Sequence, residues 1–139
     1  MTRGGPVPAT YTGRVGNRIL AWAIALVVGL VYGAAGSAAH AATWLGLPVG
    51  LLLAVVGAGA MVLAVRLLIG DRWAALATGL GMMLATWVLS QPSPGGSVLF
   101  TQAHEIAALV WMAAVPVWTA LVVAFPDPAR LGRATAERR

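Results

Sequence analysis

Residues 47–72 read "LPVGLLLAVVGAGAMVLAVRLLIGDR", and this stretch decides the fold. Between positions 47 and 69 it holds a single charged side chain, that of Arg66. A helix crosses a hydrocarbon core of roughly 30 Å with about 20 mostly apolar residues, because each residue adds about 1.5 Å of rise. The "GDR" that follows is typical of a tight turn. We therefore predict a membrane-spanning helix over residues 47–69 that reverses at residues 70–72.

The rest of the chain repeats this pattern. Hydrophobic residues make up 60% of the 139 residues and charged residues only 9%, with a mean hydropathy of +0.85. Soluble domains carry about 25% charged residues. We predict an all-α membrane protein, a four-helix transmembrane bundle with spans at 19–41, 47–69, 73–90 and 103–125. A basic arm (1–18) and a basic tail (126–139) flank this transmembrane domain (19–125).

All nine basic residues are arginines, and they lie on one side of the predicted topology. They precede the first span (Arg3, Arg14, Arg18), flank the turn after the second (Arg66, Arg72) and follow the fourth (Arg130, Arg133, Arg138, Arg139). Basic residues in short loops keep those loops cytoplasmic. We therefore predict a multi-pass protein of the cell inner (plasma) membrane with both termini cytoplasmic. This topology accounts for the net charge of +5, so a nucleic-acid partner is not needed to explain it.

A cleaved signal peptide is the alternative interpretation of the first span. The "AAHAA" at residues 38–42 imitates a small-residue cleavage site. However, it lies about 40 residues into the chain, and the apolar run exceeds the roughly 7 to 15 residues of a signal peptide. We favour a retained transmembrane helix.

Small residues recur at four-residue spacing along the first span. They are Gly29, Gly33 and Ser37, with Gly36 beside them. Such a pattern lets helix backbones approach closely in lipid. We predict that this face packs against a neighbouring helix, and the pattern fits docking against a neighbouring subunit equally well.

Four of the six tryptophans fall near predicted span ends. Trp22 and Trp73 lie near the cytoplasmic interface, and Trp44 and Trp87 lie near the opposite one. Tryptophan rings anchor helices at the level of the lipid headgroups, so these positions agree with the four-span topology.

The fourth span contains two deeper tryptophans and a proline. Trp111 and Trp118 lie seven residues apart, nearly on one face, and we expect them to pack in the bundle or to face lipid. Pro116 predicts a kink and a freed backbone carbonyl one turn earlier. Thr119 or water is the expected partner of that carbonyl.

Two histidines and a glutamate provide candidate ligands at the end opposite the arginines. His40 ends the first span, and His104 and Glu105 open the fourth. If these helices are antiparallel, both imidazoles lie at the same membrane level and could meet. They would then hold a b-type haem or, with Glu105, a metal ion. The alternative, which we favour, is structural: Thr101 or Gln102 caps the helix, and Glu105 suits its N-terminus.

Several chemistries are excluded by what the sequence lacks. Without cysteine there is no disulfide, iron–sulfur cluster or thiolate zinc site. No ionisable residue lies in the middle of a predicted span, whereas proton-coupled transporters and pumps use such groups. A phosphate-binding glycine loop and a nucleophile elbow are also missing. The sequence therefore predicts a protein that is not an enzyme.

Three segments carry a family resemblance: "PSPGGSVL" at 92–99, "ALVWM" in the fourth span and the closing "VAFPDPARLG". Together they resemble the second half of a family of small, uncharacterised four-helix membrane proteins of actinobacteria. The lysine-free, alanine-rich composition suits a GC-rich genome. This resemblance covers the last third of the chain, and it implies no activity and no functional residues.

These features favour a non-catalytic accessory or assembly subunit of a larger membrane complex. The chain is small and has no folded domain outside the predicted spans, so its partners are expected to be the lipid bilayer and other membrane subunits or a second copy. One alternative is a haem- or metal-binding protein at the extracytoplasmic face, using His40, His104 and, for a metal, Glu105. The other is a small facilitator or lipid-interacting protein.

Reporter fusions test the topology. A reporter active only in the cytoplasm should be active when fused after Arg139 and silent when inserted within residues 92–97, because the two sites flank the fourth span. If both fusions report the same side, the number of spans is wrong.

Overall fold

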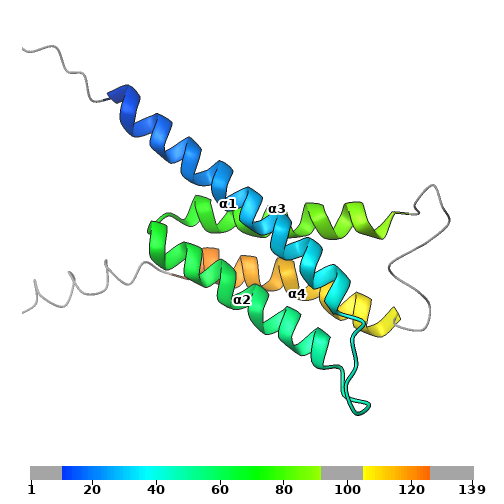
Figure 1. The fold of residues 1–139 in the computed structure, drawn as a ribbon. Helices are drawn as coiled ribbons and strands as arrows, with labels where there is room; N and C mark the ends of the chain where they lie inside the picture. Colours follow the sequence, from blue (N-terminus) through cyan, green and yellow to red (C-terminus); the bar gives the residue numbers. More distant parts are fainter. Residues whose placement is uncertain (1–10, 92–104, 126–139) are drawn as a thin grey trace, which may run out of the picture.

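The computed structural model describes the backbone of residues 11–91 and 105–125 and the side chains from Val15 onward. These ranges contain four helices: α1 (Tyr11–Ala39), α2 (Val49–Ile69), α3 (Arg72–Ser90) and α4 (Glu105–Ala124). Each helix is long and apolar enough to cross a membrane, and no strand longer than an isolated bridge occurs in the described residues. The predicted all-helical architecture with four spans is confirmed (Figure 1). The chain is a multi-pass membrane protein.

Helix α1 runs from Tyr11 to Ala39, whereas the predicted first span runs from residue 19 to residue 41. The helix therefore begins well before the predicted span and ends slightly before it. The segment "YTGRVGNR" contains no proline, so nothing in it stops the helix from continuing beyond the apolar stretch. Residues 11–18 of the predicted basic arm are therefore helical. Residues 1–10, the start of the predicted fourth span at 103–104 and the tail at 126–139 lie outside the described residues.

Two residues reverse the chain between α2 and α3. Gly70 adopts a left-handed conformation (φ 68°), and its N–H donates to the carbonyl of Arg66 at 3.0 Å. Asp71 then caps α3, because its Oδ1 accepts a hydrogen bond from the backbone N–H of Trp73 at 3.0 Å. This turn places the end of α2 directly beside the start of α3.

Helices α1 and α3 cross with their backbones in direct contact (Figure 1). A Cβ on Gly33 would lie 2.6 Å from the Cα of Met82, and Gly29 faces the backbone of Thr78 just as closely. On α3, Gly81 faces the backbone of α1 in return. The glycine stripe of α1 (Gly29 and Gly33) thus lies against α3 of the same chain, and other faces of α1 remain for any neighbouring subunit.

Helix α3 is the most enclosed of the four helices, although it is the least apolar. Its span has a hydropathy of 1.4, against 2.1 to 2.5 for the others, yet 44% of it is buried compared with 22% to 28%. Thr78 and Thr86 occupy buried positions on it. Polar and small residues are tolerated there because other helices, and not lipid, surround them. This position explains the weak transmembrane signal of residues 73–90.

Both deep tryptophans of α4 pack within the bundle. Trp111 is fully buried, and the half-buried ring of Trp118 lies over Gly59 of α2. A glycine at position 59 is what allows the indole to lie against the α2 backbone. The sequence left open whether these tryptophans pack in the bundle or face lipid, and in the structure both make packing contacts.

Helix α4 continues through Pro116 as far as Ala124. The expected bond from Thr119 to the carbonyl freed by the proline is not formed. Thr119 Oγ1 donates instead to the carbonyl of Val115 at 2.8 Å. A helical threonine reaches the carbonyl four residues back on its own turn, whereas the freed carbonyl of Met112 lies seven residues back.

The loop between α1 and α2 is a tight apolar hairpin. Trp44 and Leu47 exchange backbone hydrogen bonds of 3.0 and 2.9 Å. Between them, Leu45 and Gly46 adopt positive φ values of 51° and 78°. The left-handed conformation costs leucine about 1–2 kcal/mol. Trp44 and Leu45 are both largely exposed, and an apolar tip with an indole suits the membrane interface.

Adding one methyl group to the glycine stripe tests the α1–α3 contact. Gly33→Ala should destabilise the protein by about 1–3 kcal/mol, because the new Cβ overlaps the backbone of Met82. Gly16→Ala is the matched control on the same helix, since a Cβ there meets nothing within 4 Å. Thermal unfolding in detergent should separate the two variants. Equal stability would show that the two backbones are not in contact.

Candidate functional site

Two groups of polar residues lie at opposite ends of the bundle. The first, the serine cluster, consists of Ser37, His40, Thr86 and Trp111. The second, the arginine cleft, is lined by Asn17, Arg18, Ala21, Trp22, Ile69, Gly70 and Asp71.

The serine cluster joins three helices through one hydroxyl group. Ser37 Oγ on α1 donates to Thr86 Oγ1 on α3 at 3.2 Å and accepts from Trp111 Nε1 on α4 at 3.2 Å. All three side chains are buried. Gly36 makes this arrangement possible, because the Trp111 ring occupies the place that a Cβ at position 36 would take. Ser37 Oγ thus links α1 to α3 and to α4, and these buried bonds stabilise the bundle.

His40 caps the end of α1. Its Nδ1 lies 2.7 Å from the carbonyl oxygen of Ser37, and its backbone N–H donates to Gly36 at 2.9 Å. A carbonyl can only accept, so Nδ1 carries a proton and Nε2 is the acceptor atom in the neutral ring. The side chain is 2% exposed. This geometry satisfies a carbonyl in the last turn of the helix.

The predicted haem or metal site is only partly within the described residues. Glu105 is exposed in the first turn of α4. His104 lies outside the described ranges. Within residues 11–91 and 105–125, no group of three His, Cys, Asp or Glu side chains could hold a metal ion. A site formed by His40, His104 and Glu105 therefore stays a prediction.

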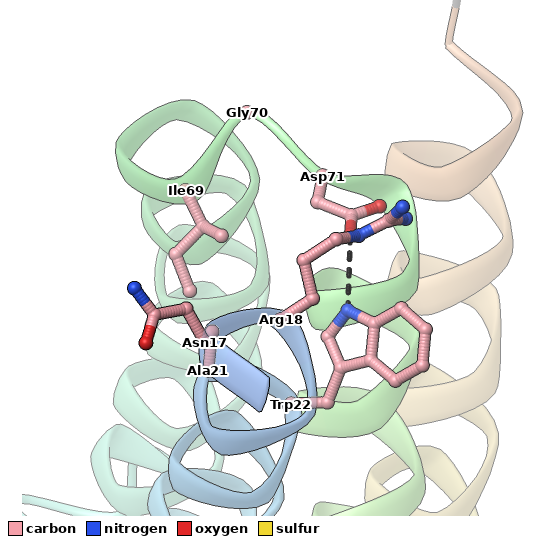
Figure 2. Close-up of a pocket in the computed structure, with 7 residues that line it drawn as sticks. All are labelled: Asn17, Arg18, Ala21, Trp22, Ile69, Gly70 and Asp71. Carbon is pink, nitrogen blue, oxygen red and sulfur yellow. Dashed lines mark hydrogen bonds and ion pairs between the residues drawn. The ribbon is translucent and has the colours of Figure 1, made fainter. Parts of the chain in front are cut away.

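The arginine cleft lies between the N-terminal half of α1 and the α2–α3 turn. Figure 2 shows the side chains of Arg18 and Trp22 directed at Asp71, with Asn17 on the side of Ile69. Asp71 Oδ2 accepts from Trp22 Nε1 at 2.9 Å and from Arg18 Nη2 at 3.4 Å. The Arg18 guanidinium also lies 5.4 Å from the centre of the Trp22 ring.

Asp71 is the polar centre of this cleft. Burial alone would raise the pKa of its carboxyl group, but hydrogen bonds from Trp22, the Trp73 backbone and Arg18 outweigh burial, so the pKa is lowered from its ordinary value of 3.8. Sequence reasoning assigned "GDR" to a turn and missed the site. The available signal was an aspartate immediately before a helix, which is typical of an N-cap.

Two further arginines lie at the same end of the bundle. Arg66 Nη2 donates to the carbonyl of Phe125 at 3.2 Å and so ties α2 to the end of α4. Arg72 lies 6.0 Å from the centre of the Trp73 ring. Arg18, Arg66 and Arg72, which the sequence assigned to topology, therefore also make specific contacts.

Acid should weaken the attachment of α1 to the α2–α3 turn. Because the pKa of Asp71 is lowered, its charge stabilises the fold above pH 3.8, and this contribution is lost as the pH falls through the folded pKa. Asp71→Asn keeps an acceptor and a good N-cap but loses the charge. This variant should unfold at a lower temperature than the wild type at neutral pH. In acid, the unfolding temperatures of the two proteins should converge. Asp71→Ala, which also loses the cap, should be the least stable of the three at neutral pH.

Comparison with known families covers nearly the whole chain. The family of unknown function DUF6113 matches residues 6–135, a range that includes all four helices and both polar sites. No curated protein and no solved structure matches the chain. The resemblance to an uncharacterised family is confirmed, and it extends well beyond the last third of the sequence. The chain belongs to the family of unknown function DUF6113.

Proposed function

We propose that this protein is a non-catalytic accessory or assembly subunit of a larger membrane complex. Two features support the proposal: the use of polar side chains within the spans and the shape of α1. Both features concern contacts between helices.

The polar groups within the described spans hold the bundle together. The serine cluster joins α1, α3 and α4. The hydroxyl of Tyr32 donates to the carbonyl of Ala54 at 3.3 Å and joins α1 to α2. Thr78 and Thr119 donate to carbonyls of their own helices at 3.1 and 2.8 Å. Groups bonded in this way contribute to packing and do not need a substrate to satisfy them.

Helix α1 has two opposite faces. Leu20, Ile24, Val27 and Val31 form an apolar seam that lies about 180° from the glycine stripe, at about 100° per residue. Their exposed fractions are 55% to 66%. An exposed apolar face of a membrane helix can meet lipid or a second helix, and we infer that the apolar seam meets a membrane helix of another protein.

The single observation that carries the proposal is the N-terminal end of α1. It extends beyond the other three helices (Figure 1), and residues 15–20 are all exposed. This end of the helix includes the first residue of the apolar seam. A second helix can pack against the apolar seam there without displacing the Arg18–Asp71 pair, because Arg18 lies on the glycine side of α1. An exposed helix end of this kind is better suited to a subunit of a complex than to a protein that functions alone.

Purification of the tagged full-length chain in mild detergent, followed by mass spectrometry, tests the proposal. We expect a second membrane protein in stoichiometric yield. The double variant Leu20→Ala, Ile24→Ala truncates the apolar seam, so it should reduce partner recovery at least about fivefold. The control Leu52→Ala, Leu67→Ala removes two equally exposed side chains from α2 and should leave recovery unchanged.

Recovery of the chain alone would contradict the proposal, and so would equal losses in both double variants. The same preparation tests the haem alternative through its absorption spectrum. A Soret band that disappears in both His40→Ala and His104→Ala would favour a haem protein over an accessory subunit.

A further inference from the structure

The arginine cleft has the size and position of a small-molecule site. Its volume is about 520 Å³, within the range of about 300–1,000 Å³ found for ligand pockets. It opens where the α2 span ends and the α3 span begins, and the ends of membrane spans lie near the level of the headgroups. Its lining combines apolar side chains, Ala21 and Ile69, with the charged Arg18 on the side of Asp71 (Figure 2). A ligand with an apolar and a polar part would fit this lining.

Charge around the cleft favours an anion. Among the side chains described at this end of the bundle there are three arginines (Arg18, Arg66, Arg72) and one carboxylate, that of Asp71, which contacts Arg18. Asp71 already accepts hydrogen bonds from Arg18, Trp22 and the Trp73 backbone. Its charge is therefore largely compensated within the protein. The net excess of positive charge is left to attract a ligand.

Arg18 is both held in place and open to a ligand. Asp71 and the Trp22 ring fix its guanidinium from two sides. Its side chain is nevertheless 59% exposed. A guanidinium carries five N–H donors, and the described contacts use one of them. The remaining donors form a planar fork that matches phosphate oxygens.

We propose that the arginine cleft binds the phosphodiester of an anionic phospholipid. The phosphate lies at Arg18, and the glycerol and upper acyl chains lie along Ala21 and Ile69. A zwitterionic lipid would bring its ammonium group to a region that already has excess positive charge, so the cleft selects lipids with a net negative charge. This site is independent of the apolar seam and of the proposed accessory role.

Lipid titration of the purified full-length protein, followed by native mass spectrometry, tests the site. We expect the wild type to bind phosphatidylglycerol roughly tenfold more tightly than phosphatidylcholine. Arg18→Gln should abolish this preference, because the phosphate loses a charge-assisted hydrogen bond. Arg72→Gln removes an equal charge from the neighbouring turn without altering the cleft lining, so it should keep the preference.

Ala21→Leu separates a defined site from diffuse surface charge. This variant fills the cleft and changes no charge, so it should also lose the preference for phosphatidylglycerol. It leaves the Arg18–Asp71 pair intact, so its result holds even if Arg18→Gln unfolds. Retained preference in Ala21→Leu, or an equal loss in Arg72→Gln and Arg18→Gln, would overturn the proposal. So would binding of soluble glycerol 3-phosphate as tight as that of phosphatidylglycerol, because the ligand would then be a water-soluble phosphate.

Discussion

The rest of the structure depends on the backbone contact between α1 and α3. Lipid provides no hydrophobic driving force for helix association, so helices in a membrane are held by van der Waals packing and hydrogen bonds. Gly29 and Gly33 on α1 and Gly81 on α3 have no side chains to separate the helices, so the two backbones come together at these positions. Helices α2 and α4 then pack around this pair, with Gly59 and Gly79 making room for side chains of α4.

Polar bonds reinforce the same helix pair on either side of the crossing. At one end Ser37 donates to Thr86, and at the other Asp71 accepts from Arg18 and Trp22. The Ser37–Thr86 bond is buried, where hydrogen bonds are stronger than in water and an unsatisfied partner is costly, whereas the exposed Arg18–Asp71 pair contributes less. They therefore favour this arrangement of α1 on α3 over sliding or rotation along an otherwise smooth apolar surface.

The two ends differ in what they can do chemically. The serine cluster is buried and uses its hydroxyl and indole groups for contacts between helices. The arginine cleft is open and carries donors in excess of its internal acceptors. Histidine is the more familiar ligand, which drew sequence reasoning to His40, His104 and Glu105. The predicted topology accounted for the positions of the arginines, so the sequence prediction included none of their contacts within the fold.

The sequence by itself determined the class and the four spans, because membrane insertion depends on local apolar runs. It also indicated a close-packing face at Gly29 and Gly33, since that pattern repeats within a single helix. Only the tertiary structure decided that this face meets α3, that Ser37 bonds Trp111 and that Arg18 meets Asp71. Those pairs are 74 and 53 residues apart in the chain. Their meeting depends on how each helix rotates against its neighbours, and apolar periodicity does not specify that rotation when lipid and protein interior are equally apolar.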